Sequence, residues 1–358
     1  MSFKRILILA PHPPSVSASQ RFRFEHYLTY LAENEFSYDY EPFIDLKTWK
    51  ILLLPGHFSQ KVFGILMGFF NRFLLLGSLG KYDYVFIHRE AAPVGPPFFE
   101  WWISKIAGKK IIYDFDDAIW FKVASKSNPY AGWIKWPGKV KHICSYSWKV
   151  TTGNSWLASY AKNYSSNVVV VPTVVETDKV HSRIKEYNGS LVTIGWTGTF
   201  TNFPYLKMVT STIHQLAEKF AFQFVIIADK DPLFDNCKYV YKRWNKISEI
   251  DDLLEFDIGL MPLPDTDLAK GKCAFKAIQY MALGVPAVVS NVGANNEVVD
   301  NGINGFVCNN EQDWLEVLSL LLNDADLRKN MGKLARKKIV ESYSVTATRT
   351  LFASLFEG

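Results

Sequence analysis

LAKGKCAFKAIQYMALGVPAVVSNVGANNEVVDNGINGFV, residues 268–307, combines one helical pattern with two short apolar runs. The helix is predicted over about 274–283 and ends at Gly284, a residue type that commonly follows the last turn of a helix. The runs PAVVSN at 286–291 and GFVC at 305–308 are typical of parallel strands that are buried on both faces. This stretch therefore predicts a strand–helix–strand unit.

Apolar runs of the same kind recur along the chain, with helical patterns such as those at 205–219 and 313–323 between them. The alternation predicts an α/β fold made of two Rossmann-like, doubly wound parallel sheets. The other predicted strands are RILILA at 5–10, YVFIH at 84–88, KIIYDF at 110–115, KVTTG at 149–153, NVVVVP at 167–172, LVTIGW at 191–196, FQFVIIAD at 222–229 and DIGLMPL at 257–263.

The length of 358 residues fits two such domains of roughly 150–180 residues each. A polar stretch, VETDKVHSRIKEYNGS at 175–190, has no apolar period and is interpreted as the linker, with the boundary near Asn188. We expect one domain at 1–188, a second at 189–340, and a helix at 341–358 that packs back on the N-terminal domain.

Composition narrows the class of protein. The four cysteines are scattered without a C-x-x-C pair, which favours a reduced, cytoplasmic compartment and argues against a metal site. The N-terminal MSFKRILILA resembles a first buried strand rather than a signal peptide. The net charge is +5, but no nucleic-acid-binding signature accompanies it, so phosphorylated or membrane-surface partners are favoured over nucleic acid.

A candidate anion site precedes the helix at 274–283. Gly271 lies in a loop that leads into the helix, and the N-terminus of a helix attracts negative charge. Lys270, Lys272 and Lys276 bring three ammonium groups to this loop and first turn. For Lys270 and Lys272 a solvated lysine run is an equal alternative, whereas the apolar neighbours of Lys276 favour a functional role.

The segment Tyr280-Met281-Ala282-Leu283-Gly284-Val285-Pro286-Ala287-Val288 resembles the Met-Ala-x-Gly-x-Pro-x-Val ending found in group 1, or family 4, retaining glycosyltransferases. The following 293–306 and DADLRKNMGKLARKKIVESYSV at 324–345 also resemble that family, and the likeness covers most of 150–345. It implies the GT-B architecture, in which two Rossmann-like domains face each other across a cleft. It also implies a metal-independent, retaining transfer from a nucleoside diphosphate sugar, with no separate cofactor and an acceptor-side N-terminal domain.

The resemblance also implies roles for residues of the C-terminal, donor-binding half. The family carries two glutamates where this chain has Gly271 and Gln279. Gln279 retains the ability to bind a ribose hydroxyl, whereas Gly271 offers no carboxylate to the donor sugar. Lys272 belongs to the same expected site, and Lys276 with the helix dipole is expected to stabilise the departing diphosphate.

Two further segments are candidates for nucleotide contacts. The loop expected at 195–199 contains Thr197 and Gly198, whose backbone N–H groups would approach a phosphate, although a plain tight turn explains it equally well. Glu249 corresponds to a position near the family's nucleotide, although a capped surface helix beginning at Ser248 is the alternative.

In the N-terminal half, polar residues follow the predicted strands. Asp116 and Asp117 follow the strand KIIYDF and are interpreted as acceptor-side or transition-state carboxylates, with helix capping as the alternative. Arg89 follows another strand and is expected either to grip a phosphate or to pair with Asp114. Arg21 and Arg23 are expected in an acceptor-facing loop, with a charged helix face as the alternative, and His12 is a weaker candidate.

The segment VFGILMGFFNRFLLLGSLG at 62–80 is apolar but is interrupted by Asn71 and Arg72. Since a membrane span needs about 20 apolar residues, it predicts a core helix or a helix lying at a membrane surface. In the second case Lys61 and Arg72 would reach anionic headgroups while phenylalanines enter the interface.

Together these features predict a cytoplasmic glycosyltransferase that acts on a lipid-linked or surface polysaccharide glycan. A peripheral location on the inner face of the membrane is one option for it. A non-catalytic sugar-nucleotide-binding subunit and a sugar-nucleotide epimerase are the alternatives. Tight donor binding without transfer would favour the former, and donor turnover without acceptor the latter.

Overall fold

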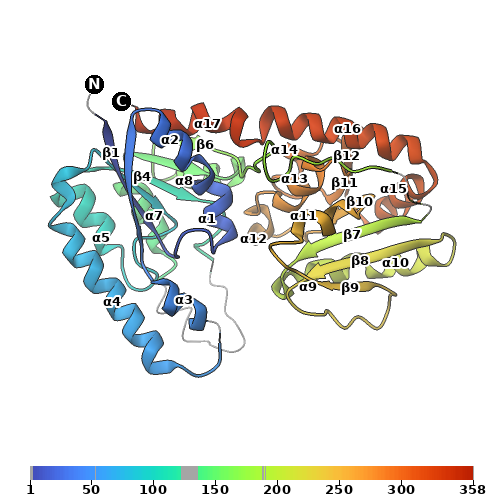
Figure 1. The fold of residues 1–358 in the computed structure, drawn as a ribbon, viewed down its shortest axis with the longest axis horizontal. Helices are drawn as coiled ribbons and strands as arrows, with labels where there is room; N and C mark the ends of the chain where they lie inside the picture. Colours follow the sequence, from blue (N-terminus) through green and yellow to red (C-terminus); the bar gives the residue numbers. More distant parts are fainter. Residues whose placement is uncertain (1–2, 53, 122–135, 188, 190, 358) are drawn as a thin grey trace. The chain divides into compact units, whose positions relative to one another are not determined.

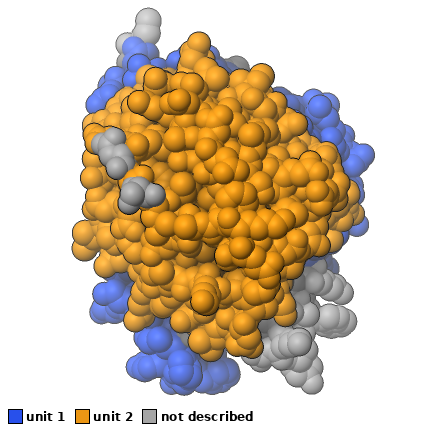
Figure 2. Space-filling view, turned by 90° about the vertical axis from the view of Figure 1, so that its right-hand side faces the viewer, with its two compact units in different colours: residues 1–172, 349–358 blue, residues 173–348 orange. Residues whose placement is uncertain are grey.

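The computed structural model describes residues 3–52, 54–121, 136–187, 189 and 191–357, and the chain divides into two compact units. Unit 1 comprises Met1–Pro172 with Arg349–Gly358, and unit 2 comprises Thr173–Thr348. Figure 2 colours the two units. Asn188, where the linker boundary was predicted, lies outside the described residues.

The polar stretch that follows residue 172 is bound to unit 2. Lys185 donates its N–H to the carbonyl of Leu283 at 2.7 Å, and its ammonium pairs with Asp257 at 3.2 Å. The Tyr187 hydroxyl donates to the carbonyl of Gly284 at 2.8 Å. These contacts tie the stretch to the turn after a helix, which explains how a segment without apolar period becomes ordered.

Unit 1 contains a six-stranded parallel sheet in the order β2-β1-β3-β4-β5-β6 (Figure 1). Every residue of β3 is buried, as expected for a parallel strand that is covered on both faces. The strands are β1 (Lys4–Ala10), β2 (Phe36–Pro42), β3 (Tyr84–His88), β4 (Lys110–Phe115), β5 (Lys149–Thr152) and β6 (Val168–Val170). The α-helices are α1 (Ala18–Arg23), α2 (Leu28–Glu33), α3 (Leu46–Leu52), α4 (Phe58–Leu76), α5 (Phe98–Trp101), α7 (Lys139–Tyr146) and α8 (Ser155–Lys162).

Unit 2 repeats the design, with the strand order β12-β11-β10-β7-β8-β9. Its strands are β7 (Val192–Gly198), β8 (Phe222–Ala228), β9 (Val240–Arg243), β10 (Ile258–Met261), β11 (Ala287–Ser290) and β12 (Gly305–Cys308). Its helices are α9 (Phe203–Leu206), α10 (Thr210–Ala217), α11 (Glu249–Leu254), α12 (Asp267–Lys270), α13 (Phe275–Ala282), α14 (Asn295–Val298), α15 (Glu311–Asn323), α16 (Ala325–Ser342) and the start of α17 (Val345–Ala353). The predicted fold class of two doubly wound parallel sheets is confirmed.

Each sheet reverses its strand order once, and that point is where ligands bind in open α/β folds. In unit 1 the reversal lies between β1 and β3, so residues after Ala10 and His88 border it. In unit 2 it lies between β7 and β10, which end at Gly198 and Met261. The fold thus selects one candidate site in each unit.

The C-terminal ten residues complete the core of unit 1. Phe352 is 3% exposed and stacks on Tyr27 with ring centroids 4.3 Å apart. Phe356 is 1% exposed and packs against Phe86, and its carbonyl accepts a hydrogen bond from Lys4 Nζ at 3.1 Å. α17 therefore begins in unit 2 and ends in unit 1.

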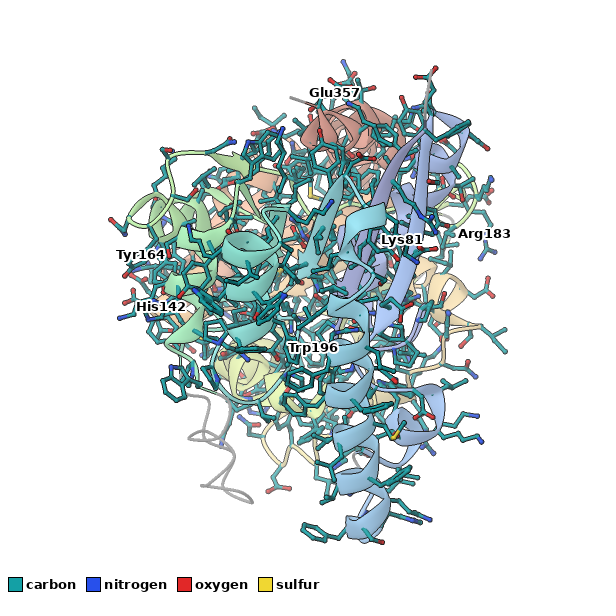
Figure 3. The ribbon with its side chains drawn as sticks, turned by 90° about the vertical axis from the view of Figure 1, so that its left-hand side faces the viewer. Lys81, His142, Tyr164, Arg183, Trp196 and Glu357 are labelled. Carbon is teal, nitrogen blue, oxygen red and sulfur yellow. The ribbon has the colours of Figure 1, made fainter. Side chains whose placement is uncertain are left out.

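α4 presents an apolar face to solvent. Gly64 and Gly68 lie on its inner face, where an added Cβ would lie 2.3 Å from Thr48 Oγ1 and 2.5 Å from the Phe43 carbonyl oxygen, respectively. Many bulky side chains of this helix, whose ribbon and side chains are drawn in Figure 3, are exposed. The strongly exposed ones include Phe58, Phe63, Leu66, Phe70, Phe73 and Leu74.

Arg72 lies on the inner face of α4 and does not reach solvent. It is 1% exposed, and its guanidinium donates to the carbonyl oxygens of Ala91 at 2.9 Å and Glu41 at 2.8 Å. The prediction that Arg72 contacts lipid headgroups is therefore wrong, because its guanidinium group donates hydrogen bonds to backbone carbonyls inside unit 1. In the described part of the chain, no helix has the length and apolarity needed to span a bilayer.

Candidate active site

The first turn of α13 forms the centre of the unit 2 site. Ala274, just before the helix, has a left-handed backbone with φ +51°, which is unusual for a residue with a side chain. On the other side of the loop, Gly293 has φ +54°, and a Cβ there would lie 2.7 Å from the carbonyl oxygen of Lys270. Strained backbone is found preferentially at functional sites, so this turn is a strong candidate.

Lys276 lies in that first turn, as predicted. Burial, and then the neighbouring charge of Lys272, lower the pKa of Lys276 from 10.5 to about 8. Its ammonium lies 5.7 Å from the centroid of the Trp196 ring. Among the residues that the structure describes, none forms an ion pair or hydrogen bond with the Lys276 ammonium. A largely desolvated cation without a carboxylate is costly unless a bound anion compensates it.

Gly198, at the end of β7, makes room for this cation. A Cβ at Gly198 would lie 2.5 Å from the Trp196 ring and 3.1 Å from Lys276 Cε. Gly195 also has a packing role, because its Cβ would lie 2.1 Å from the Phe256 ring. The loop predicted at 195–199 is therefore mostly the end of a strand, since β7 continues to Gly198.

Thr197 is less available than predicted. It is 7% exposed, and its backbone N–H donates to the Tyr280 hydroxyl at 2.9 Å. That N–H is therefore not free to approach a phosphate, and the structure does not support the predicted contact of Thr197 with the nucleotide.

Gln279 and Glu249, which were predicted separately, lie together. Gln279 is 2% exposed, and its Nε2 donates to Glu249 Oε1 at 3.3 Å. The same oxygen accepts a hydrogen bond from Trp244 Nε1 at 3.1 Å. The hydrogen bond from Gln279 thus orients the half-buried Glu249 carboxylate. Sequence analysis missed Trp244, which no motif distinguishes from other surface aromatics.

The remaining lysines differ from each other. Lys270 pairs with Asp265 at 3.0 Å and Asp267 at 3.6 Å, and these two carboxylates raise the pKa of Lys270. Lys272 is half-buried and contributes the charge that depresses the pKa of Lys276. Gly271 ends α12 with an ordinary helical φ of −69°, so its backbone alone does not require glycine.

The unit 1 site is built around the buried carboxylate of Asp114, at 2% exposure. Asp114 accepts hydrogen bonds from Arg23 Nη2 at 2.5 Å and Thr151 Oγ1 at 2.7 Å, and its Oδ2 lies 2.8 Å from His88 Nδ1. Burial acts to raise the pKa of Asp114, but the charge of Arg23 and the His88 hydrogen bond outweigh it and lower the pKa to about 2. Asp114 is therefore an anion whose hydrogen-bonding capacity is used inside the unit.

Arg23 is committed to this cluster. It is 1% exposed, and besides Asp114 it donates to the carbonyl of Val171. We therefore assign it a structural role in place of the predicted contact with an acceptor or phosphate. Arg21 is half-buried and lies over the Phe22 ring at 4.8 Å, and its role remains a prediction.

Asp116 and Arg89 form the accessible part of the unit 1 site. Arg89 pairs with Asp116 at 2.7 Å, so the predicted alternative of pairing with Asp114 is wrong. The Ser19 hydroxyl donates to Asp116 Oδ2 at 2.7 Å and lies 2.8 Å from His88 Nε2. Burial acts to raise the pKa of Asp116, but the charges of Arg89 and His88 and the Ser19 hydrogen bond hold it well below its usual range.

Strain marks this site also, because Arg89 has φ +61°. The carbonyl of Arg89 accepts a hydrogen bond from the Tyr113 hydroxyl at 2.8 Å, which helps hold this conformation. Asp117 is half-buried, and one of its carboxylate oxygens accepts the N–H of Ala118 at 2.9 Å. Both aspartates thus remain candidates for contacts with an acceptor.

His12 borders the same reversal point but is uncharged. Burial, then the charges of Arg89 and His88, lower the pKa of His12 to about 4. Its Nδ1 is buried, and in the described residues nothing bonds to it. Ser19, His88 and Thr151 were missed, although His88 could have been selected because it ends a predicted strand. In the described ranges, no group of three or more His, Cys, Asp or Glu side chains is placed to hold a metal ion.

Comparison with known proteins adds a sequence similarity in one segment and a shared fold to this geometry. Residues 272–338, which include Lys276 and Gln279, match the sequence model of the family described as glycosyl transferases group 1. Spore coat protein SA of Bacillus subtilis (strain 168) is 29% identical over 82 residues. That match spans 22% of this chain and 22% of the length of that relative.

Two solved structures share the fold over nearly the whole chain. Sucrose-phosphate synthase from Thermosynechococcus elongatus has a TM-score of 0.69 at 13% identity and covers 99% of this chain and 98% of its own. HepE of Anabaena in complex with UDP has a TM-score of 0.68 at 13% identity, with 98% and 99% covered. The chain thus has the GT-B fold of these two solved structures, and its segment 272–338 is similar to the group 1 glycosyl transferases.

Proposed function

We propose that this chain transfers a sugar from a nucleoside diphosphate sugar to an acceptor hydroxyl. The observation that carries the proposal is Lys276, a half-buried cation in the first turn of α13 whose pKa burial lowers and which has no anionic partner among the described residues. The segment that matches the family contains this residue. A diphosphate is the ligand chemistry that would compensate such a charge.

The geometry of unit 2 supports separate roles for its residues, some toward the diphosphate and one toward the ribose. Lys276 and the N-terminal end of α13 would stabilise the negative charge that builds on the leaving group as the glycosidic bond breaks. Lys272 adds a second positive charge nearby. The Glu249 carboxylate, held by Gln279 and Trp244, would accept hydrogen bonds from ribose hydroxyls.

For the reaction course we propose retention of configuration and no metal requirement. Since two ammonium groups and a helix N-terminus already neutralise the diphosphate, a bridging metal is not needed for charge balance. In the retaining family that the sequence resembles, the leaving phosphate assists acceptor deprotonation, so no separate protein base is required.

On the acceptor side, we propose that Asp116 and Asp117 contact the acceptor or the developing positive charge of the sugar. The Arg89 ion pair and the Ser19 hydrogen bond keep Asp116 ionised and oriented for that task. Arg21 and Arg89 remain candidates for an acceptor phosphate.

Nucleotide binding and turnover test the proposal. Wild-type protein should bind UDP or ADP in calorimetry, and Asp117→Asn should abolish transfer while leaving nucleotide affinity unchanged. Asp178→Asn, an exposed carboxylate elsewhere, serves as the matched control. Absence of binding to every nucleoside diphosphate overturns the proposal. Binding without transfer supports a non-catalytic subunit, which the glycine and glutamine at the family's glutamate positions would explain, and donor turnover without acceptor supports an epimerase.

We further propose that the chain works at the inner membrane surface on a lipid-linked or surface glycan. The support is the outward apolar face of α4, with Phe58 at 80%, Phe63 at 65% and Leu66 at 60% exposure. Soluble monomers rarely expose a contiguous patch of this kind. Lys47 and Lys50 on neighbouring α3 are exposed and can meet anionic headgroups, since Arg72 cannot.

Liposome flotation tests this membrane proposal. The protein should float with vesicles that contain anionic lipid, less with neutral ones, and replacing Phe63, Leu66 and Phe70 with Ser should abolish flotation. Phe69 and Phe73 are unsuitable because they pack on Phe43 and Phe99, respectively. The control replaces three exposed residues of unit 2, Leu320, Leu334 and Val340, with Ser. Equal flotation of the α4 variant and wild type would contradict the proposal.

A further inference from the structure

Unit 2 contains a pocket that shares no residue with the proposed nucleotide site. It has a volume of about 420 Å³ and lies at the carboxyl ends of β10, β11 and β12, beside the start of α15. This volume falls within the range of about 300–1,000 Å³ that is usual for small-molecule sites. Lys276, Gln279 and Glu249 do not line it.

The floor of the pocket is apolar. Leu263, Val292, Cys308 and Trp314 line it, and each is at most 5% exposed, so these side chains are fixed in the core of the unit. Met208 stands at the rim with 47% exposure. Such a floor suits the C–H face of a sugar ring, for which aromatic and aliphatic side chains provide contact area.

Polar groups above this floor have unused hydrogen-bonding capacity. Ser290 is 6% exposed, and its Oγ accepts the N–H of Leu263 at 2.9 Å, while no acceptor among the described residues takes the hydroxyl proton. Asn310 caps α15 by accepting the N–H of Asp313 at 3.0 Å, and its amide also interacts with the Asp313 carboxylate, which leaves one of the two amide N–H groups for a ligand. Both groups line the pocket, so donors are available for a ligand's oxygen atoms.

The charges of the lining exclude phosphorylated ligands. Asp265 and Glu311 are the charged residues of the wall, and no Lys, Arg or His lines it among the described residues. One oxygen of Asp265 pairs with Lys270, and one of Glu311 accepts from Ser211, which leaves one carboxylate oxygen of each as an acceptor. Carboxylates repel phosphate but bind hydroxyl groups well, so a neutral polyol fits this wall.

A second hollow continues the first. It has about 370 Å³ and shares Asn291 and Asn309 with the pocket, so these two asparagines form the partition. Asn291 Nδ2 donates to Asn309 Oδ1 at 2.6 Å across it. Asn296 and Asn301 line the second hollow. Amide side chains both donate and accept, which matches the alternating capacities of sugar hydroxyls.

We infer that unit 2 carries a binding site for a neutral oligosaccharide, with one sugar in the pocket over Trp314 and the next in the asparagine-lined hollow. This site is separate from the nucleotide site and holds whether or not the proposed transfer does. Its chemistry suits a growing or completed glycan rather than a sugar nucleotide.

Saturation-transfer NMR with maltotriose, cellotriose and chitotriose tests the inference. At least one should bind wild-type protein in the presence of saturating UDP. Asn310→Asp keeps a capping oxygen, since Asp and Asn cap helices equally well, but removes the amide donor. It should weaken that binding by roughly 3- to 10-fold, the change expected for one neutral hydrogen bond. Met208→Trp should obstruct the mouth and abolish binding.

Gln312→Glu, the same amide-to-carboxylate change outside the lining, is the matched control and should leave binding unchanged. The inference is overturned if none of the three sugars binds, if UDP displaces them, or if neither pocket variant weakens binding. Nucleotide affinity is measured separately on each variant. Sugar binding that survives a failure to bind UDP would refute the proposed transfer and leave this site intact.

Discussion

Replacement of Lys276 by methionine should have opposite effects on ligand binding and on stability. Methionine keeps the length and apolar body of the side chain but removes the charge. If Lys276 contacts the diphosphate, its loss removes one charge-assisted hydrogen bond, which is worth about 1.5–3 kcal/mol. UDP or ADP affinity should therefore fall by roughly 10- to 150-fold.

The ligand-free protein should become more stable at the same time. Burial lowers the pKa of Lys276 from 10.5 to about 8, and at about 1.4 kcal/mol for each tenfold change in proton affinity this corresponds to at most about 3.5 kcal/mol. The folded-state pKa lies below the unfolded one, so the cost is fully present below pH 8 and disappears as the pH rises to 10.5. The melting temperature of Lys276→Met should exceed that of wild type at pH 7 and approach it near pH 10.5.

Calorimetric titration with UDP and ADP, together with thermal unfolding at pH 7 and pH 10, measures both effects. Lys329→Met, on the exposed face of α16, is the matched control and should change neither. Unchanged nucleotide affinity in Lys276→Met would remove this residue from the site. A lower melting temperature at pH 7 would show that the ammonium has a compensating partner and would refute the electrostatic reasoning.

Three further outcomes follow from the structure. Transfer should persist in EDTA, and a loss of activity that manganese or magnesium restores would reverse the assignment of the aspartates. Gly195→Ala should destabilise unit 2 by about 1–3 kcal/mol, since its Cβ would meet the Phe256 ring, whereas Gly80→Ala, with open space around it, should cost less than about 1 kcal/mol in the same denaturation assay. Phe352→Ala should destabilise unit 1 by about 3–5 kcal/mol, and an unchanged unfolding midpoint would show that the C-terminal segment is dispensable.

Strands with an unbroken apolar run could be predicted from sequence, the edge strands β6 and β12 included, whereas the edge strands β2 and β9 could not. YVFIH and KIIYDF coincide with β3 and β4 because unbroken apolar runs have few other uses in a soluble domain. β2 and β9 were missed because their partly exposed residues, such as those of SYDYEP and VYKR, form no continuous apolar run.

The position of a candidate residue on its element could be predicted where a local pattern determines that element. Lys276 lies in the predicted first turn because the glycine after the helix and the apolar periodicity fix its start. The burial of Arg23 and Arg72 could not be predicted, because their partners are distant in sequence. Arg23 pairs with Asp114, and Arg72 donates a hydrogen bond to the carbonyl of Ala91. The Ser19–His88–Asp116 contacts depend on three separate chain segments, which no local pattern reveals.

The division of unit 1 into two chain segments has a consequence for biosynthesis. Residues 349–358 supply Phe352 and Phe356 to its core, yet the ribosome makes them after all of unit 2. Unit 2 is continuous in sequence and can acquire its fold while the chain is still being elongated. Unit 1 cannot complete its core until residues 349–358 have left the ribosome, so the apolar surface around Tyr27 and Phe86 stays uncovered while unit 2 is made. Transiently exposed apolar surface makes a chain prone to aggregate, so we expect the yield of folded protein to depend on chaperones that cover unit 1 during this interval.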